Sequence, residues 1–312
     1  MLKRHWDMII DWCKIQFKSV TGELNTVKAI WKLICTAVGC VSSFFSFAVL
    51  INDLTGYDKV ETWVKGNWWL VGIIGLLISC ILNRQKINCC KKVSTGDMQI
   101  AISIKDIFSN WTANSFIIPT NTFFRTNMEG EYISPHSVQG NFQLKYFKKN
   151  INELDRLIND SLVKQGIKGE SASDCFGPTT KYPIGTVAKI DYKEKHFYFV
   201  AINDVNKNGK PIGQSIENVN VALTAVTDVI KRMGHCDTLC IPLIGSGRAA
   251  IQEATKENVF QKTVDCFILS EDKLVSKLII SINPKDYLDE KIDLERMEKY
   301  LDYKCEFEKN TS

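Results

Sequence analysis

The chain has 312 residues, 24% of them charged, and a net charge of +4. This length allows two structural units, and so small a charge gives no footprint for nucleic acid, so we expect no nucleic-acid partner. Eleven cysteines are scattered without a CxxC pair. Their spacing argues against a structural zinc site or any other metal site, and it is typical of thiols in a reducing compartment.

Residues 1–28 show the pattern of an amphipathic helix. Apolar side chains recur there at helical spacing, with charged and polar residues opposite them; the apolar positions are Trp6, Ile9, Ile10, Cys13, Phe17 and Val20. Such a helix either lies in a membrane interface or packs against neighbouring subunits. The pattern does not decide between these two positions.

Residues 29–83 contain two apolar runs joined by a short loop. The run Leu33–Ile51 carries no charged residue and approaches the roughly 20 residues that cross a bilayer. The run Trp68–Leu82 is shorter and has Trp63, Trp68 and Trp69 at one end, where an aromatic belt would lie. Buried core helices are the alternative, but residues 70–78 are apolar on all faces. We expect a two-helix transmembrane hairpin.

Basic residues before the first run and after the second predict that both termini are cytoplasmic; they are Lys14, Lys18, Lys28, Lys32, Arg84, Lys86, Lys91 and Lys92. The protein is thus expected to be a multi-pass protein of the cell inner membrane, in contact with lipid. Small residues form tracks along both runs, at Gly39, Ser43, Ser46, Gly72, Gly75 and Ser79. These tracks either join the helices of a homo-oligomer or reflect the ordinary composition of membrane helices.

The remainder divides into a polar, basic linker over residues 84–96 and a domain over residues 97–312. Strand-like and helix-like stretches alternate in that domain, which predicts an α/β sandwich with a mixed, largely parallel sheet between helices. The expected strands cover residues 100–104, 116–118 (halted by Pro119), 187–190, 196–202, 239–241 and 278–282. The expected helices cover residues 152–165, 219–233, 251–267 and 289–303.

A glycine-spaced turn follows the strand at residues 239–241 and opens the helix expected from residue 251. Backbone N–H groups in such a turn can hold a phosphate or pyrophosphate. The expected ligand contacts are Leu243, Ile244, Gly245, Ser246, Gly247, Arg248 and Ala249. The pattern is not a P-loop, and its late position argues against a Rossmann fold. A tight turn without a ligand, and a solvated Arg248, are the alternatives.

A second polar segment, Pro119-Thr120-Asn121-Thr122, follows the strand at residues 116–118. The amide of Asn121 offers a donor and an acceptor together, which suits a pair of ribose hydroxyls. A flexible, donor-rich turn at Gly140, Asn141 and Phe142 comes before the next helix. We therefore predict a nucleotide site formed by these two segments and the glycine turn.

An apolar strand, an Asn-containing loop and a late I-P-x-I-G-x-G loop resemble macro domains, which bind ADP-ribose, over about Ile100 to Tyr287. The resemblance implies that Tyr287 lies against adenine, although a rim position on the last helix is equally consistent. Two spans followed by a macro domain with P-T-N-T-F-F and S-P-H-S-V-Q-G-N-F resemble the membrane-type ThsA effectors of Thoeris antiphage defence, over nearly the whole chain. That family implies a histidine–ADP-ribose signal made by a TIR-domain enzyme, and spans that damage the membrane.

Within macro domains, the segment from Phe197 to Gly247 is similar to an ADP-ribosyl hydrolase type, in which a Lys attacks the ribose and an Asp follows the glycine loop. Asn203 and Ala249 occupy those places here, with Lys207 and Lys210 close by. The resemblance therefore implies a sensor–effector that is not an enzyme, with no catalytic residue and no cofactor beyond its nucleotide ligand. A membrane-tethered hydrolase and a passive scaffold for ADP-ribosylated proteins remain as alternatives.

Overall fold

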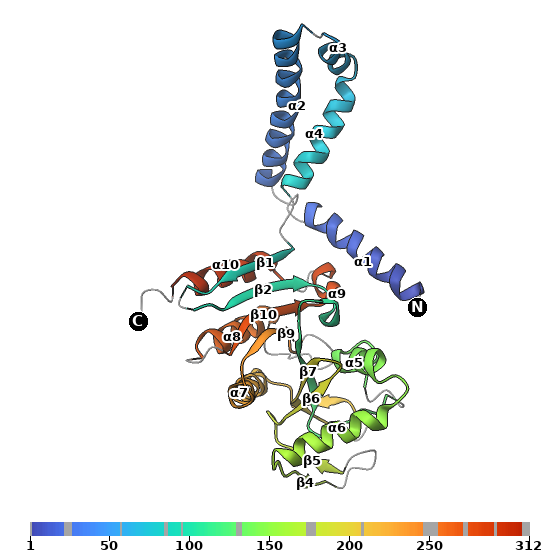
Figure 1. Cartoon of the computed structure of the whole chain (residues 1–312), viewed down its shortest axis with the longest axis vertical. Coiled ribbons are helices and arrows are strands. Elements are labelled where there is room, and N and C mark those ends of the chain that lie inside the picture. Colours follow the sequence, from blue (N-terminus) through green and yellow to red (C-terminus); the bar gives the residue numbers. More distant parts are fainter. Residues whose placement is uncertain are drawn as a thin grey trace. The chain divides into compact units, whose positions relative to one another are not determined.

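The computed structural model describes residues 2–21, 27–56, 58–83, 87–94, 96–128, 133–172, 179–206, 209–245, 255–270, 274–289 and 292–307. The chain divides into two compact units, Met1–Ile87 and Asn88–Ser312. The first unit is helical, and the second is a sheet covered by helices (Figure 1).

The first unit contains α1 (Leu2–Thr21), α2 (Val27–Thr55), α3 (Lys59–Gly66) and α4 (Trp68–Leu82). The helix predicted within residues 1–28 is present as α1. Among the described helices, α2 alone is long and apolar enough to cross a membrane by itself, over Ile30–Thr55. Helix α4 has 15 residues and spans about 22 Å, which is less than the ~30 Å of a bilayer core. Helix α4 is long enough to cross a membrane only if α3 is counted as part of the same span. The chain bends by 82° between α3 and α4.

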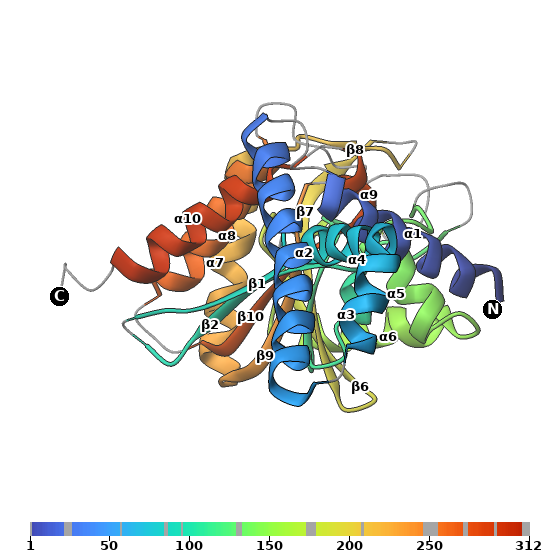
Figure 2. The ribbon, with the colours of Figure 1, turned by 90° about the horizontal axis from the view of Figure 1, so that it is seen from above.

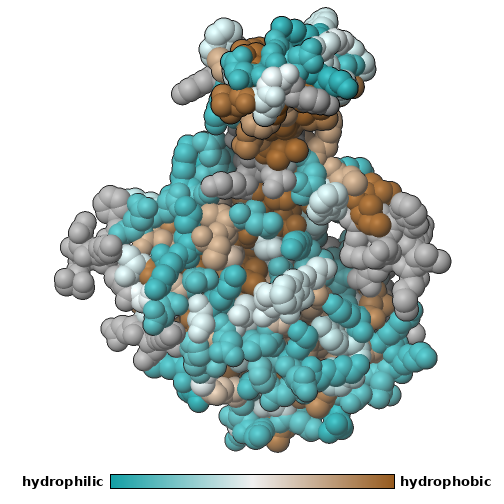
Figure 3. Space-filling view, turned by 45° about the horizontal axis from the view of Figure 1, so that its top comes forward, coloured by the Kyte–Doolittle hydropathy of each residue, from teal (hydrophilic) through white to brown (hydrophobic). Residues whose placement is uncertain are grey.

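Helices α2 and α4 pack side by side as a hairpin (Figure 1). Small and medium-sized side chains fill the contact, with Ala48, Val64 and Val71 buried together. Ser79 donates a hydrogen bond to the carbonyl of Leu33 across the hairpin, at 2.7 Å. Many of the large apolar side chains of the hairpin are exposed. Figure 3 shows apolar side chains on the hairpin, whereas most of the visible surface of the second unit is hydrophilic.

The second unit is built on one mixed sheet with the order β1-β2-β10-β9-β3-β7-β6, and β8 pairs with β7. The strands are β1 (Asn88–Lys92), β2 (Gln99–Ile104), β3 (Ser115–Asn121), β6 (Val187–Tyr192), β7 (Lys195–Val205), β8 (Pro211–Ile212), β9 (Cys236–Pro242) and β10 (Val275–Ile282). The five central strands are parallel, and β1, β6 and β8 are antiparallel additions at the edges. A separate ribbon joins β4 (Glu170–Ser171) to β5 (Thr180–Lys181).

Helices cover both faces of this sheet. Figure 2 shows α7, α8 and α10 on one face and α5 and α6 on the other. Their bounds are α5 (Val138–Tyr146), α6 (Ile151–Lys164), α7 (Ile216–Met233), α8 (Lys256–Ile268), α9 (Pro284–Leu288) and α10 (Leu294–Phe307), and a 3-10 turn covers Ile107–Ser109. The predicted α/β sandwich with a mixed, largely parallel sheet is confirmed.

Aromatic rings form the core between the sheet and α5. The ring centroids of Phe142 and Phe197 lie 4.7 Å apart, those of Phe142 and Phe199 lie 5.1 Å apart, and Phe116 stacks on Phe197. These rings are buried. Each buried aromatic side chain removes about 150–250 Å² from water, so this cluster fixes the face of the sheet on which α5 begins.

Four predicted boundaries are wrong. The predicted linker contains β1, in which Cys89 is buried and Lys91 forms an ion pair with Asp302 at 2.6 Å, so a basic composition concealed an edge strand. Strand β3 does not stop at Pro119. Its pairing with β9 is limited to Ser115 and Phe116, so the backbone N–H that proline lacks is not needed for pairing with β9 at position 119.

The two C-terminal helices also begin later than predicted. The hydroxyl of Thr255 accepts a hydrogen bond from the Asn258 N–H and caps α8, so the helix expected from residue 251 begins at Lys256. The helix expected over residues 289–303 begins at Leu294 as α10, and a separate short helix, α9, with Pro284 in its first turn, comes before it.

Candidate functional site

A pocket of about 340 Å³ opens where strands β3 and β9 separate. These strands pair only at their first residues, Ser115 with Leu239 and Phe116 with Cys240. Strands β2, β10 and β9 extend the sheet on one side of this point and β7 on the other. Because all five run parallel, their carboxyl ends meet at one edge, and a crevice where the strand order reverses is the usual ligand position in such sheets.

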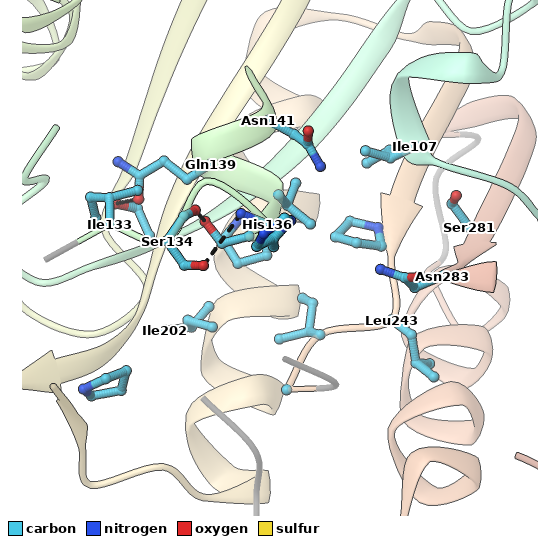
Figure 4. A pocket seen from close by; sticks show the side chains of 18 of the residues that line it. Ile107, Ile133, Ser134, His136, Gln139, Asn141, Ile202, Leu243, Ser281 and Asn283 are labelled. Atoms are coloured by element: carbon cyan, nitrogen blue, oxygen red, sulfur yellow. Dashed lines mark hydrogen bonds between the residues drawn. The ribbon is translucent and has the colours of Figure 1, made fainter. Parts of the chain in front are cut away.

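The walls of the pocket come mainly from the carboxyl ends of these strands and from the start of α5. Figure 4 shows Ile133, Ser134, Gln139 and Ile202 on one side and Ser281, Asn283 and Leu243 on the other. The polar and charged lining residues are Lys105, Asp106, Thr120, Asn121, Ser134, His136, Ser137, Gln139, Asn141, Asn203, Ser281, Asn283, Lys285, Asp286 and Asp289. The apolar ones are Ile107, Pro119, Ile133, Val138, Ile202, Val205, Pro211, Pro242, Leu243 and Ile244, together with Gly209 and Gly245.

Two asparagines lie opposite each other at the ends of β3 and β7. A bulge between Thr120 and Asn121 shifts the register so that Asn121 pairs with Asn203, and bulges commonly re-aim side chains at binding sites. The Asn121 Oδ1 accepts the N–H groups of Phe123 at 3.0 Å and Arg125 at 3.4 Å. Its amide NH₂ is therefore the group left to donate into the pocket.

Asn203 is oriented the other way. Its Nδ2 donates to the carbonyl of Asp204 at 2.7 Å, which leaves Oδ1 as an acceptor. The neighbouring carboxylate of Asp204 accepts from the Thr122 hydroxyl at 3.0 Å and the Val205 N–H at 2.8 Å, and it pairs with Lys181. Partial burial acts to raise the pKa of Asp204, but these partners outweigh it and lower the pKa below its ordinary value of 3.8.

The start of α5 forms the wall next to Asn121. The hydroxyl of Ser137 caps the helix by accepting the Gly140 N–H at 3.0 Å. The buried Gln139 donates to the carbonyl of Arg125 at 2.6 Å and accepts the Thr120 hydroxyl at 3.1 Å. These bonds join α5 to β3, so the amides of Gln139 and Asn121 are held in one rigid wall.

A carboxylate, Asp106, lines the opposite end of the pocket, directly after β2. It accepts the Phe108 N–H at 3.0 Å and the Asn141 side-chain amide at 3.4 Å. Behind it, the buried Asn110 donates to Ser281 Oγ at 3.4 Å, and Ser281 donates to the carbonyl of Lys105 at 2.8 Å. This network fixes the turn after β2 relative to β10.

The short helix α9 closes the same end. Asn283 caps it by accepting the Lys285 N–H at 3.0 Å, and the buried Asp286 forms an ion pair with Lys256 at 2.6 Å. This ion pair joins α9 to the first residue of α8. Two exposed cations, Lys105 and Lys285, lie in the lining at this end together with the exposed carboxylate of Asp289.

The structure brings together seven of the predicted site residues around this pocket: Pro119, Thr120, Asn121, Asn141, Leu243, Ile244 and Gly245. Gly245 has φ of 77°, a conformation that favours glycine. The other residues of the glycine turn, Ser246, Gly247, Arg248 and Ala249, lie outside the described residues. The idea that this turn opens a helix directly is corrected by the start of α8 at Lys256.

Four predicted contacts are not among the lining residues. Phe142 is a core residue between Phe197 and Phe199. Gly140 lies inside α5 rather than in a turn, and a Cβ there would lie 2.0 Å from the Ser134 carbonyl oxygen, so the glycine permits close packing. Thr122 bonds Asp204. Tyr287 is buried in α9, and burial raises its pKa.

Sequence reasoning missed the lining residues Asp106, Gln139, Ser281 and Asp286. A signal was available for two of them, because Asp106 and Ser281 lie at the ends of strands that were predicted. Gln139 and Asp286 belong to α5 and α9, neither of which was predicted: a turn was expected at Gly140, and the last helix was expected only from residue 289. Among the described residues, no group of three or more His, Cys, Asp or Glu could hold a metal ion.

Comparisons with known proteins agree on one family. The family model described as the macro domain of Thoeris protein ThsA matches residues 100–283. The Thoeris protein ThsA of Bacillus amyloliquefaciens (strain Y2) is 28% identical over 234 residues, which are 74% of this chain and 74% of that protein.

Two solved macrodomains show partial structural similarity. An Oceanobacillus iheyensis macrodomain variant with ADPR has a TM-score of 0.47 at 12% identity and covers 70% of this chain and 100% of that one. A Trypanosoma brucei macrodomain in complex with ADP-ribose has a TM-score of 0.42 at 8% identity and covers 65% and 68%. Because the family model matches more than half of the sequence, this chain belongs to the Thoeris ThsA macro-domain family.

Proposed function

We propose that this protein is a membrane-anchored sensor–effector of antiphage defence, which binds an ADP-ribose-type signal in the pocket between β3 and β9 without consuming it. The observation that carries the proposal is the Asn121–Asn203 pair at the ends of β3 and β7. One amide has a donor left and the other an acceptor. A ribose diol needs both, because each hydroxyl donates and accepts.

The opposite end of the pocket suits a nucleobase. The Asp106 carboxylate can accept a hydrogen bond from the exocyclic amine of a base, and the apolar side chains of Ile107 and Leu243 can pack against its ring. A volume of about 340 Å³ falls within the range of small-molecule sites, about 300–1,000 Å³. The pocket thus offers an acceptor at one end and paired amides at the other, and we assign the phosphates to the turn that begins at Gly245.

The absence of hydrolysis is also part of the proposal. The buried polar side chains that line the pocket next to the proposed ribose position are the amides of Asn121, Gln139 and Asn203 and the hydroxyl of Thr120. Amides do not transfer protons at neutral pH, so they supply neither a general acid nor a general base. His136 is the titratable side chain on that wall, and its backbone N–H bonds Ser134 at 3.3 Å. A tethered hydrolase would depend on it or on a nearby lysine.

The ligand that family membership favours is histidine–ADP-ribose, delivered by a TIR-domain enzyme. We propose that α2 and the α3–α4 pair both cross the inner membrane, with both termini in the cytoplasm. We further propose that bound nucleotide favours an assembly of several copies that disrupts the bilayer. A ligand can shift such an equilibrium only by binding one state more tightly than the other.

Titration calorimetry of the full chain in detergent tests the binding step. We expect ADP-ribose or its histidine conjugate to bind, and Asn203→Leu to weaken binding by roughly 1–3 kcal/mol, because the acceptor is lost. Asn150→Leu is the matched control, since Asn150 is exposed and does not line the pocket. Wild-type affinity in folded Asn203→Leu would place the ribose elsewhere.

Chromatography of the recovered nucleotide tests the claim that the ligand is not consumed. The conjugate and an ADP-ribosylated peptide should both remain intact after hours with excess protein. Several turnovers that disappear in His136→Ala or Lys210→Gln would establish the hydrolase instead. Binding to ADP-ribosylated protein but not to free nucleotide would favour a scaffold.

A further inference from the structure

Helix α1 carries an exposed apolar stripe that the proposed function does not use. Ile9, Cys13 and Phe17 recur every fourth residue, and Ile10 lies beside them, so the four side chains share one face. Ile9 is 41% exposed, Ile10 46% and Phe17 72%, and Trp12 at the edge is 60% exposed. We call Ile9, Ile10, Cys13 and Phe17 the α1 stripe.

Burial is confined to another side of this helix. Ile15 is 5% exposed and Ser19 is fully buried, and their spacing of four residues places them together, away from the stripe. Among the described side chains of α1, the buried residues Ile15 and Ser19 therefore lie on one side, while the four residues of the α1 stripe are exposed on another. Exposed apolar groups gathered on one face mark a site that contacts a protein or a membrane.

The charges of α1 favour a membrane over a second copy. Four basic residues (Lys3, Arg4, Lys14 and Lys18) exceed two acidic ones (Asp7 and Asp11), which gives 4 − 2 = +2 for Leu2–Thr21 without His5. By helical spacing Lys14 and Lys18 lie on other sides of α1 than the stripe, so the stripe stays apolar while these side chains can face anionic headgroups beside it. A stable protein interface also needs about 800 Å² from each partner, more than four side chains in a narrow stripe provide.

The position of α1 in the chain points the same way. It ends at Thr21, and α2 begins at Val27, so the intervening segment can extend no more than about 20 Å. The part of α2 that is apolar enough to cross a bilayer begins at Ile30, with Lys32 and the 67% exposed Trp31 beside it. Trp and Lys at this place mark the water–lipid boundary. The end of α1 must stay close to that boundary.

We propose that α1 lies along the surface of an anionic bilayer, with the α1 stripe among the acyl chains and the basic residues at the headgroups. Amphipathic helices with excess Lys and Arg bind membranes in this way. The proposal rests on the membrane crossing of α2 but not on the nucleotide pocket. It gives the chain a second, charge-dependent lipid contact beside the crossing helices.

Photo-crosslinking in the full chain separates lipid from protein as the occupant. p-Benzoylphenylalanine is placed at Phe17, where it replaces one aromatic ring by another, or at Asp11 on another side of α1 as the matched control. Each protein is reconstituted into vesicles of equimolar phosphatidylglycerol and phosphatidylcholine, without nucleotide, and irradiated. Lipid adducts and chain–chain adducts are then counted by mass spectrometry.

We expect lipid adducts at position 17 to exceed those at position 11 by roughly tenfold and to favour phosphatidylglycerol. Lys14→Gln with Lys18→Gln should reduce that lipid preference by roughly fivefold, because each basic residue contributes to anionic-lipid binding. Adducts from position 17 to a second copy or to another part of the chain would overturn the proposal. Equal lipid adducts at both positions would overturn it as well. Nucleotide binding, measured separately, reports on the pocket alone.

Discussion

The α2–α4 hairpin and the sheet unit place their residues in opposite ways. In the hairpin, small residues and a serine lie inside and large apolar residues lie outside, with Ser79 fully buried while Trp68 is 67% exposed. In the sheet unit, Phe142 and Phe197 are fully buried and charged residues cover the surface. Water drives apolar groups together in the second unit, whereas the pattern of the hairpin is the one expected if, as we propose, it lies in a membrane, where close backbone packing and hydrogen bonds hold helices together.

The glycines of the hairpin have two different surroundings. At Gly75 a Cβ would lie 2.6 Å from Val41 Cγ2 and 3.3 Å from the carbonyl oxygen of Ala37, so this glycine belongs to the contact between α4 and α2 of the same chain. Gly39 and Gly72 have no atom within that reach. The predicted tracks therefore divide into one that holds the hairpin together and one that remains open to another copy.

The boundary between the two regions gives the largest expected effect. A fragment of residues 88–312 retains β1, whereas a fragment of residues 97–312, the predicted domain, loses it. The shorter fragment should be less stable by roughly 5 kcal/mol, because it loses the buried Cys89 and Val93 and a five-residue ladder. Urea unfolding compares them. Equal stability would mean that β1 belongs to a linker after all.

The hairpin contact gives the next largest effect. Gly75→Leu should destabilise the hairpin by roughly 1–3 kcal/mol, because the new side chain meets Val41 and the α2 backbone. Gly72→Leu, at the open position on the same helix, should leave hairpin stability unchanged and impair only assembly. Thermal unfolding and sizing in detergent distinguish the two. Equal unfolding midpoints for Gly75→Leu and Gly72→Leu would contradict the assignment of Gly75 to the hairpin contact and of Gly72 to the contact between copies.

In the pocket, Asn121→Asp separates recognition from folding. The remaining oxygen can still accept the N–H groups of Phe123 and Arg125, so stability should change little. Affinity for ADP-ribose should fall by about tenfold to a hundredfold, because a donor becomes an anionic acceptor. Calorimetry with a parallel melting curve measures both. Unchanged affinity would remove Asn121 from the ribose site.

The smallest expected effect concerns pH. Because the folded-state pKa of Asp204 is lowered, its stabilising contribution is present at neutral pH and is lost as the pH falls below 3.8 toward the folded value. The stability difference between wild type and Asp204→Asn should therefore shrink from neutral pH to about pH 3. Urea titrations across that range provide the test, and a constant difference would argue against a charged Asp204.

The sequence was sufficient for most central strands, because β7 and β10 contain consecutive apolar residues at 197–202 and 278–280, and apolar residues alternate in β2 at Ile100, Ile102 and Ile104. It was insufficient at β1, where alternation over five residues is hidden by Cys and Lys. The site residues, too, were predicted only where a local sequence pattern marks them. Asn121 and Gly245 stand at recognisable strand ends, whereas the contribution of Gln139 depends on bonds to Thr120 and Arg125 that no local pattern reveals.

Dye release from vesicles containing the full chain tests most directly whether the two regions act together. We predict release when histidine–ADP-ribose is added to the wild-type protein, little release without it, and none above background in Asn203→Leu, whose hairpin is unchanged. Equal release with and without the nucleotide, or nucleotide-dependent release that survives the loss of Asn203, would contradict a sensor that controls the membrane through this pocket.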